Sequence, residues 1–187
     1  MDLRVKRTQM NIRNAFLELR SKKPLEKITV KELAELACIN KATFYQHYKD
    51  IYDLSESMED ELIEGILASI PHPDTLVEDP GRATQELFYA FSTQTHLVDI
   101  LFSGDRRGML VSKLESRVYD LILTKHPEYR QPQSRTSQPY AQENLEKEIL
   151  ITFLIQGSFH AYLKHSAKDK EAVVRIISEY TGRFRPS

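Results

Sequence analysis

Three helix starts close together near the N-terminus limit the fold of this chain more than any other feature. Thr29 is followed three residues later by Glu32, which is the spacing of a capping box. Asn40 and Asp50 give the same N-cap signal ahead of the next two stretches with helical periodicity. Helices that begin roughly ten residues apart must be short and sharply turned. The sequence therefore predicts a cluster of short helices in this region.

Helical periodicity also runs through most of the remaining chain, and no segment alternates convincingly between apolar and polar residues as a surface strand does. We therefore expect an all-α fold. Beyond the short cluster, helices are predicted over residues 7–23, 51–70, 82–94, 95–104, 105–126, 141–166 and 168–184.

A proline-rich break at residues 71–81 is the predicted boundary between two domains. Residues 1–54 form the expected N-terminal head, and the helix at 51–70 connects it to a C-terminal helical body at 71–187. Within that body, residues 127–140 are polar and contain three prolines, which predicts a mobile loop.

Charge is unevenly divided along the chain, although the formal net charge of the whole is only -1. Residues 1–50 hold 11 Lys and Arg against 6 Asp and Glu, and the remaining residues hold 15 against 21. A basic head on an acidic body predicts that the head meets an anionic partner such as DNA.

Composition argues against secretion, a membrane span and catalysis. Cys38 is the single cysteine, so no intramolecular disulfide can form, which fits a reducing compartment. No apolar run approaches the roughly 20 residues of a transmembrane helix, and the first ten residues lack the apolar core of a signal peptide. The six histidines are scattered, and no phosphate-binding glycine loop occurs. We expect a cytoplasmic protein that is not an enzyme and holds no cofactor and no metal.

Two short helices joined by residues 37–40 form a helix-turn-helix pattern, with "TVKELAEL", "ACIN" and "KATFYQHY" as its parts. Ile39 is expected to be buried at the corner, and Phe44 and Tyr48 lie one turn apart on the inner face of the second helix. The outer face of that helix is then able to enter a major groove. An ordinary solvated surface is the alternative, which the basic charge and the repeated caps disfavour. The side chains expected to bind DNA are Thr29, Lys31, Lys41, Ala42, Thr43, Tyr45, Gln46, His47 and Lys49.

Residues 8–54 resemble the DNA-binding head of the tetracycline-repressor (TetR/AcrR-type) family of transcriptional regulators. The stretch "ITVKELAELACINKATFYQHYKDIYDL" carries the resemblance. It implies an all-helical, Ω-shaped homodimer whose two heads enter successive major grooves of a palindromic operator. Two positions depart from the family: Cys38 stands at the usual glycine of the turn, and Ile51 stands at the lysine usual at the start of helix four.

The resemblance also implies a body that binds a small effector or a partner. The expected function is a sequence-specific repressor that a small-molecule effector releases from DNA. An activator or co-regulator of the same fold, controlled by a protein partner, is the alternative. A third and less favoured alternative is an enzyme with a vestigial head. The sequence shows no nucleophile paired with a base and no set of metal-binding residues that would support it.

Beyond about residue 80 the resemblance is architectural, and the body residues are assigned from apolar stripes. Such stripes also form when helices pack into the core of a single chain, and periodicity does not separate the two cases. The candidate dimer interface comprises Leu145, Ile149, Phe153, Gln156, Phe159, Leu163, Val173, Val174, Ile177 and Tyr180. The candidate walls of a ligand pocket are Phe88, Phe91, Phe102, Leu114, Tyr119, Phe153 and Tyr162.

Overall fold

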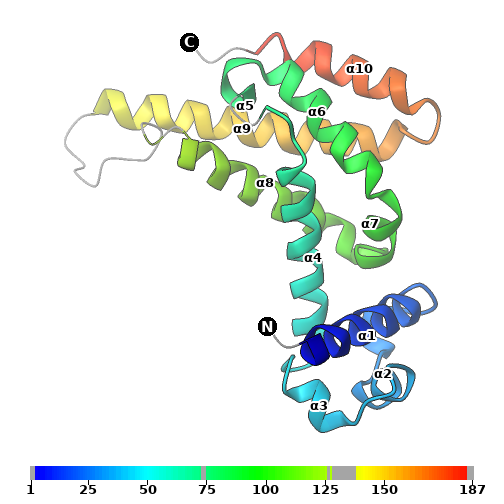
Figure 1. Cartoon of the computed structure of the whole chain (residues 1–187). Coiled ribbons are helices and arrows are strands. Elements are labelled where there is room, and N and C mark those ends of the chain that lie inside the picture. The colour runs from blue at the N-terminus through cyan, green and yellow to red at the C-terminus, as the bar shows by residue number, and fades with distance from the viewer. Residues whose placement is uncertain (1–2, 73–74, 126, 128–137, 185–187) are drawn as a thin grey trace. The chain divides into compact units, whose positions relative to one another are not determined.

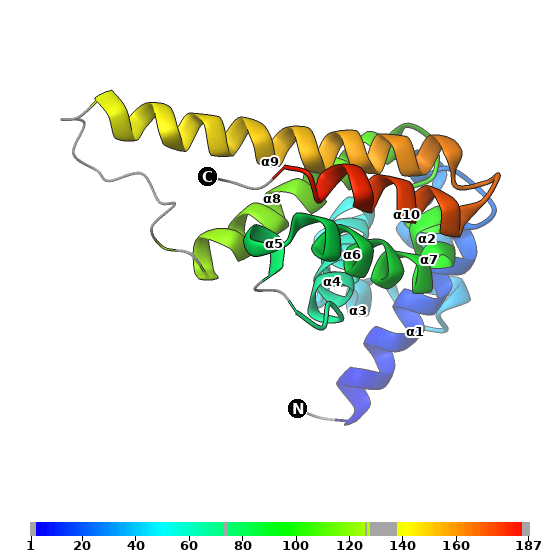
Figure 2. The same ribbon diagram turned by 90° about the horizontal axis from the view of Figure 1, so that it is seen from above.

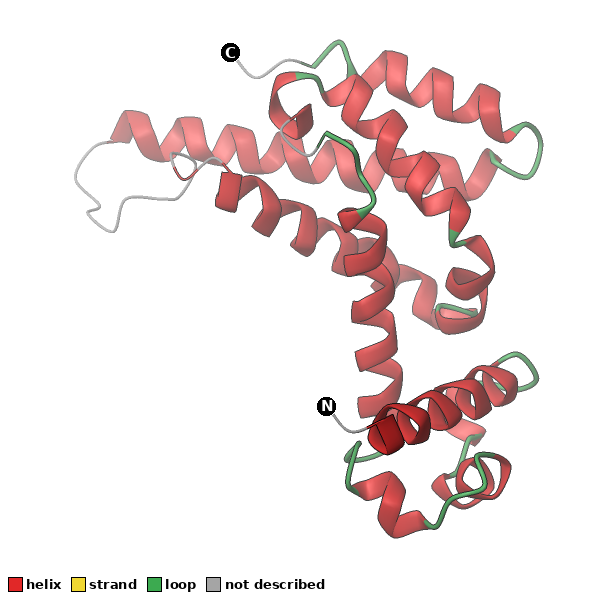
Figure 3. Cartoon of the chain, in the orientation of Figure 1, coloured by secondary structure: helices red, strands yellow, loops and turns green. Residues whose placement is uncertain are grey.

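The computed structural model of the chain describes residues 3–72, 75–125, 127 and 138–184, and within these ranges every regular element is helical (Figure 3). The all-α prediction is therefore confirmed. The α-helices (Figure 1) are α1 (Leu3–Arg20), α2 (Val30–Leu36), α3 (Lys41–Tyr45), α4 (Ile51–Ala68), α5 (Thr75–Glu78), α6 (Pro80–Thr93), α7 (Thr95–Leu101), α8 (Arg107–Lys125), α9 (Gln138–His165) and α10 (Lys170–Thr181). Two short 3₁₀ turns are η1 (Leu25–Lys27) and η2 (Gly104–Arg106).

The chain divides into two compact units whose limits differ from the predicted domains. The N-terminal unit comprises Met1–Leu62 and Thr95–Arg107, and the C-terminal unit comprises Ile63–Gln94 and Gly108–Ser187. The division falls within α4 instead of at the proline-rich break, and α7 and η2 join the N-terminal unit. Long-range contacts cause this difference, and local composition carries no sign of such contacts.

The three predicted helix starts are confirmed by their hydrogen bonds. Thr29 Oγ1 accepts the amide hydrogen of Glu32 at 3.3 Å. The side chains of Asn40 and Asp50 accept the amides three residues on, at 2.7 and 2.8 Å. One detail differs from the expected capping box, since the carboxylate of Glu32 pairs with the ammonium of Lys23. Each start therefore satisfies an amide that the helix itself leaves unpaired.

The turn between α2 and α3 depends on an unusual backbone conformation. Cys38 has a φ of 54°, in the left-handed region that glycine adopts at little cost and other residues rarely enter. The departure from glycine seen in the sequence therefore falls on a strained position. Ile39, which was expected to be buried at the corner, is only half-buried, whereas Phe44 on α3 is fully buried.

The C-terminal unit is held by close packing of α10 on α6 and α9 (Figures 1 and 2). Gly81 on α6 lies so close to α10 that an added Cβ would be 2.8 Å from the carbonyl oxygen of Ser178 and 2.9 Å from the Cα of Gly182. Farther along α6, the ring of Phe88 stacks on Tyr162 at a centroid distance of 4.5 Å. Glycine is thus required where the backbones approach, and aromatic rings fill the space farther on.

Three predicted boundaries in the C-terminal unit were wrong in detail. The proline-rich break contains the one-turn helix α5, and α6 begins at Pro80 because proline fits the first helical position, where no amide is needed. Asp79 caps α6 by accepting the amide of Arg82 at 3.1 Å. The loop predicted at 127–140 lies largely outside the described residues, but residues 138–140 belong to α9.

Candidate nucleic-acid interface

The outward face of α3 and its flanks is open to solvent. The exposed fraction is 57% for Tyr45 and 0% for its neighbour Phe44, so adjacent residues on one short helix have opposite environments. Thr43 and His47 are half-buried. The other predicted contact residues are exposed, namely Thr29, Lys31, Lys41, Ala42, Gln46 and Lys49. All nine predicted side chains therefore have at least part of their surface available to a partner.

Aromatic packing fixes the orientation of α3. The ring of Phe44 meets that of Tyr45 edge to face at a centroid distance of 5.5 Å, and it lies 5.8 Å from the ring of Tyr48. Burial raises the pKa of the Tyr48 phenol, so Tyr48 is a neutral part of the core. Since Phe44 and Tyr48 anchor the inner side of the helix, the side chain of Tyr45 is held on the outer side.

Asn40 restricts what Thr43 can offer a partner. Its side-chain oxygen accepts both the amide of Thr43 at 2.7 Å and the hydroxyl of Thr43 at 3.0 Å. The proton of that hydroxyl is therefore already used. Thr43 retains its acceptor lone pairs and its methyl group, which suit contacts to a base amino group or a thymine methyl. Sequence reasoning identified Asn40 as a cap but missed this second role.

Unpaired cations mark this face of the N-terminal unit. Among the described residues, no carboxylate lies within 4.0 Å of the ammonium groups of Lys31, Lys41 or Lys49. Elsewhere in the same unit, Lys22 pairs with Glu18 at 2.7 Å, and the side chains of Arg13 and Lys23 also pair with carboxylates. The lysines around α3 are therefore available to an external anion without loss of an existing ion pair.

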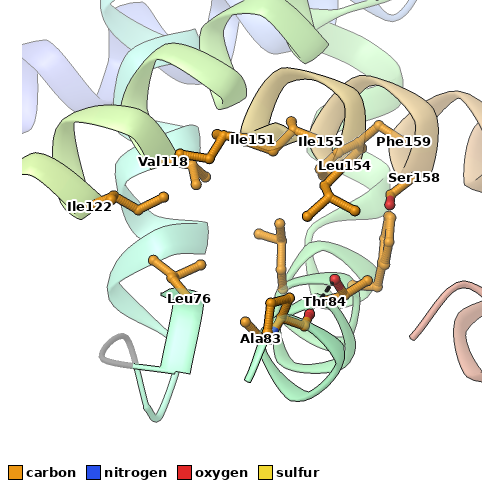
Figure 4. Close-up of a pocket in the computed structure, with 13 residues that line it drawn as sticks. Leu76, Ala83, Thr84, Val118, Ile122, Ile151, Leu154, Ile155, Ser158 and Phe159 are labelled. Atoms are coloured by element: carbon orange, nitrogen blue, oxygen red, sulfur yellow. Dashed lines mark hydrogen bonds between the residues drawn. The ribbon is translucent and has the colours of Figure 1, made fainter. Parts of the chain in front are cut away.

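The C-terminal unit contains a partly open apolar cavity of about 60 Å³ between α5, α6, α8 and α9 (Figure 4). Among the described residues of its wall, the polar side chains are Thr84 and Ser158, and the hydroxyl of Thr84 is already bonded to the carbonyl oxygen of Pro80 at 2.7 Å. The wall is formed by Leu76, Pro80, Ala83, Thr84, Leu87, Phe88, Val118, Ile122, Ile151, Leu154, Ile155, Ser158 and Phe159.

Only one of the seven predicted pocket residues, Phe88, lines this cavity. Phe102 belongs to the N-terminal unit and Phe153 is 64% exposed, so both assignments were wrong. Tyr119 lines a separate open groove between α8 and α9, where its hydroxyl donates to Glu148 at 3.0 Å. Three of the predicted pocket residues are buried in the core without lining the cavity, namely Phe91, Leu114 and Tyr162. Periodicity identified apolar faces but not which of them borders empty space.

The predicted dimer residues separate into three groups by exposure. Leu145, Ile149 and Phe153, spaced by one helical turn on α9, are 53%, 59% and 64% exposed. On α10, Tyr180 is 58% exposed. Three residues of the prediction are half-buried, namely Gln156, Leu163 and Val173. Three were assigned wrongly because they are buried within their own chain, namely Phe159, Val174 and Ile177.

Sequence reasoning missed two exposed apolar residues beside Tyr180. Ile176 is 46% exposed and Phe184 is 42% exposed, and the ring of Phe184 lies 6.3 Å from that of Phe153. The spacing of four residues from Ile176 to Tyr180 to Phe184 could have predicted a second apolar stripe. The prediction instead followed the stripe through Ile177. These residues form what we call the apolar face: Leu145, Ile149, Phe153, Ile176, Tyr180 and Phe184.

No family model matches the chain, and comparison with curated proteins and with solved structures found no match either. Within the described ranges, no three His, Cys, Asp or Glu side chains are grouped so that they could hold a metal ion. None of the helices described is both long enough and apolar enough to cross a membrane. The role of the site must therefore be inferred from its own residues.

Proposed function

We propose that the protein is a sequence-specific DNA-binding regulator of transcription of the tetracycline-repressor type, in which α2 and α3 form a helix-turn-helix. The observation that carries the proposal is the contrast across α3, where Phe44 is fully buried and Tyr45 is 57% exposed. A helix that only filled space would not need an outward face of aromatic and polar groups among unpaired lysines.

The outward side chains fit two roles at a duplex. Ala42, Thr43, Tyr45 and Gln46 have the sizes and hydrogen-bonding groups that read base edges in a major groove, and glutamine pairs with adenine there. Residues that flank them suit phosphate oxygens, because they offer ammonium, imidazole or hydroxyl groups, and these are Thr29, Lys31, Lys41, His47 and Lys49. The protein would then act by binding DNA and not as an enzyme.

We propose that the working form is a homodimer. A single short helix contacts too few base pairs for useful specificity, whereas two heads on half-sites about 34–36 Å apart multiply it. The apolar face on α9 and α10 supports this proposal because contiguous exposed apolar surface is costly on a monomer. A second copy related by two-fold symmetry would cover it, with α9 and α10 of each protomer packing together.

For the control of DNA binding, the first candidate is a repressor that a small molecule in the C-terminal unit releases from its operator. The apolar cavity lined by Phe88 supports that candidate, although its volume of about 60 Å³ is below the roughly 300–1,000 Å³ of sites for small ligands. Binding would therefore have to enlarge it. The small volume favours the second candidate, an activator or co-regulator controlled by a protein partner.

Selection of bound duplexes from a random oligonucleotide pool tests the proposal without knowledge of the operator. We expect an enriched palindrome with half-sites roughly one or more helical turns apart, bound by two protomers. Affinity for it should fall steeply with salt, because several phosphates are neutralised. A pool that shows no enrichment over repeated rounds would refute the proposal.

Two pairs of variants separate the assigned roles. Lys41→Gln should weaken binding to all sequences alike and reduce the salt slope by about one, whereas Gln46→Ala should relax preference at a single base position. Ile149→Glu combined with Phe153→Glu should yield monomers in sedimentation, because both charges fall on the apolar face. Lys164→Glu, an exposed charge change elsewhere on α9, is the matched control and should leave the dimer intact.

A further inference from the structure

The N-terminal unit has a concave surface that plays no part in the proposed contact with DNA. It is an open hollow of about 700 Å³ formed by the end of α1, the turn η1, helix α7 and the turn η2. That volume lies within the range of roughly 300–1,000 Å³ typical of small-molecule sites. We call it the basic hollow and define it by Arg20, Lys22, Lys23, His96, Ser103 and Arg106.

A buried guanidinium with unused hydrogen-bonding capacity lies beneath the hollow. Arg20 is only 4% exposed. It donates from Nη1 to the carbonyl oxygen of Lys23 at 3.2 Å and from Nη2 to that of Leu101 at 3.3 Å. Among the described residues its Nε has no hydrogen-bond partner. A buried charged group without full satisfaction is costly and calls for an explanation.

A second guanidinium, that of Arg106, lies at the same floor and is paired with a buried carboxylate. Arg106 donates from Nε and Nη2 to Oε1 of the fully buried Glu59, at 3.0 and 2.6 Å. Burial lowers the pKa of Arg20, the neighbouring charge of Arg106 lowers it further, and Glu26 and Glu59 each raise it. Among the described residues at the floor, the guanidinium groups of Arg20 and Arg106 lie near one buried carboxylate, that of Glu59.

The rim adds further cationic and neutral groups. Lys22 and His96 are exposed and Lys23 is half-buried, and the ammonium groups of Lys22 and Lys23 pair with Glu18 and Glu32, which do not line the hollow. Of the two rim carboxylates, Asp99 already faces Arg107 at 3.5 Å, and Glu26 is exposed to water, which screens its charge. Ion pairs exposed to solvent are weak, so Lys22 and Lys23 can exchange their carboxylate partners for an anion bound in the hollow.

We propose that the basic hollow binds a small, multiply charged anion through phosphate or carboxylate groups. Arg106, whose side chain is 19% exposed, and the rim lysines would make the contacts, and Arg20 would supply positive potential from below. A guanidinium presents paired N–H donors that match the two oxygens of a phosphate or carboxylate. This site goes beyond the proposed reading of DNA and does not depend on it, because no residue of α2 or α3 lines the hollow.

Ser103 allows a test that removes no existing contact. It lines the hollow and, although it stands at the N-cap of η2, its side chain makes no capping hydrogen bond. Ser103→Glu places a carboxylate in the hollow, and Ser103→Gln is the matched neutral control of the same size. Calorimetric titration of the full chain with pyrophosphate, at ionic strength held constant with sodium chloride, should show binding to the wild type and to Ser103→Gln.

The Glu variant should bind pyrophosphate roughly tenfold more weakly or worse than the Gln variant, which corresponds to about 1.4 kcal/mol. Lys22→Gln, which removes an exposed rim charge, should weaken binding in the same direction. A parallel titration with citrate distinguishes a phosphate preference from a carboxylate preference. Equal affinity in the Glu and Gln variants, or no heat from the wild type, would overturn the proposal.

A last pair of substitutions separates the hollow from the face around α3. Lys41→Gln with Lys49→Gln should leave the affinity for pyrophosphate unchanged, because neither lysine lines the hollow. If this pair removed binding and Ser103→Glu did not, the anion would be held by the α3 face and the proposal would be wrong. The outcome is independent of whether the protein binds an operator, since no DNA is present.

Discussion

The two units of this chain are stabilised in different ways, and the difference decides what can be inferred about each. In the N-terminal unit, short helices begin at side-chain caps, such as Asn40 and Asp50, that bond amides three residues away. In the C-terminal unit, longer helices are held by contacts between residues far apart in sequence, such as Gly81 with Gly182 and Phe88 with Tyr162. Local interactions leave a signature in the sequence, whereas packing between distant helices does not.

The largest expected effect tests whether the two units fold separately. Phe44→Ala removes a fully buried ring from the N-terminal unit and should cost about 3–5 kcal/mol of unfolding free energy. Hydrogen exchange should show lost protection in α1 and α2, while amides of α6 and α10 keep theirs. Phe88→Ala is the counterpart in the C-terminal unit and should give the reverse pattern. Loss of protection throughout the chain in both variants would mean one cooperative unit.

A smaller effect is expected where backbone packing replaces side-chain packing. Gly81→Ala places a Cβ within 3 Å of the backbone of α10, and it should cost about 1–3 kcal/mol because neither helix can yield locally. Gly65→Ala on α4 is the control, since an added Cβ there meets nothing within 4 Å. It should be neutral or stabilising, by up to about 1 kcal/mol. Denaturant titration would contradict this account if both substitutions had the same effect.

The smallest expected effect is a gain in the N-terminal unit. Cys38→Gly removes a side chain from a backbone position with a φ of 54°, which relieves strain in the folded state. Glycine is also freer in the unfolded state, which offsets part of this effect. The net increase in unfolding free energy should be roughly 1 kcal/mol. Cys38→Ala keeps a Cβ at the same position and should bring no such gain. If the turn carried no strain, Cys38→Gly would have the lower denaturation midpoint of the two, because glycine loses more conformational freedom on folding.

The sequence was informative wherever structure followed from neighbours along the chain. The three helix starts, the burial of Phe44 and the exposure of Tyr45 all follow from caps and from helical spacing. The position of Cys38 was identified as the one that normally needs glycine, and its positive φ agrees.

The sequence was misleading wherever an apolar stripe had more than one possible partner. Phe153 and Phe159 on α9 were both assigned to one apolar stripe, yet the ring of Phe159 lies 4.9 Å from that of Phe88, centroid to centroid, while Phe153 is exposed. Phe102 was assigned to the C-terminal unit from its place along the chain, although α7 and the residues that follow it pack with the N-terminal unit. Such choices depend on the three-dimensional complementarity of helix surfaces, which hydrophobic periodicity does not encode.

The most direct test of the central claim compares Tyr45→Ala with the wild type in two measurements on the same protein, DNA affinity and unfolding free energy. If α3 presents its outer face to DNA, affinity for the selected duplex should fall at least about fivefold, since a direct base contact is worth about 1–3 kcal/mol. Unfolding free energy should fall by no more than about 1.5 kcal/mol, the value of the edge-to-face contact with Phe44. Unchanged affinity, or a stability loss as large as that of Phe44→Ala, would show that Tyr45 serves the fold and that α3 does not read DNA.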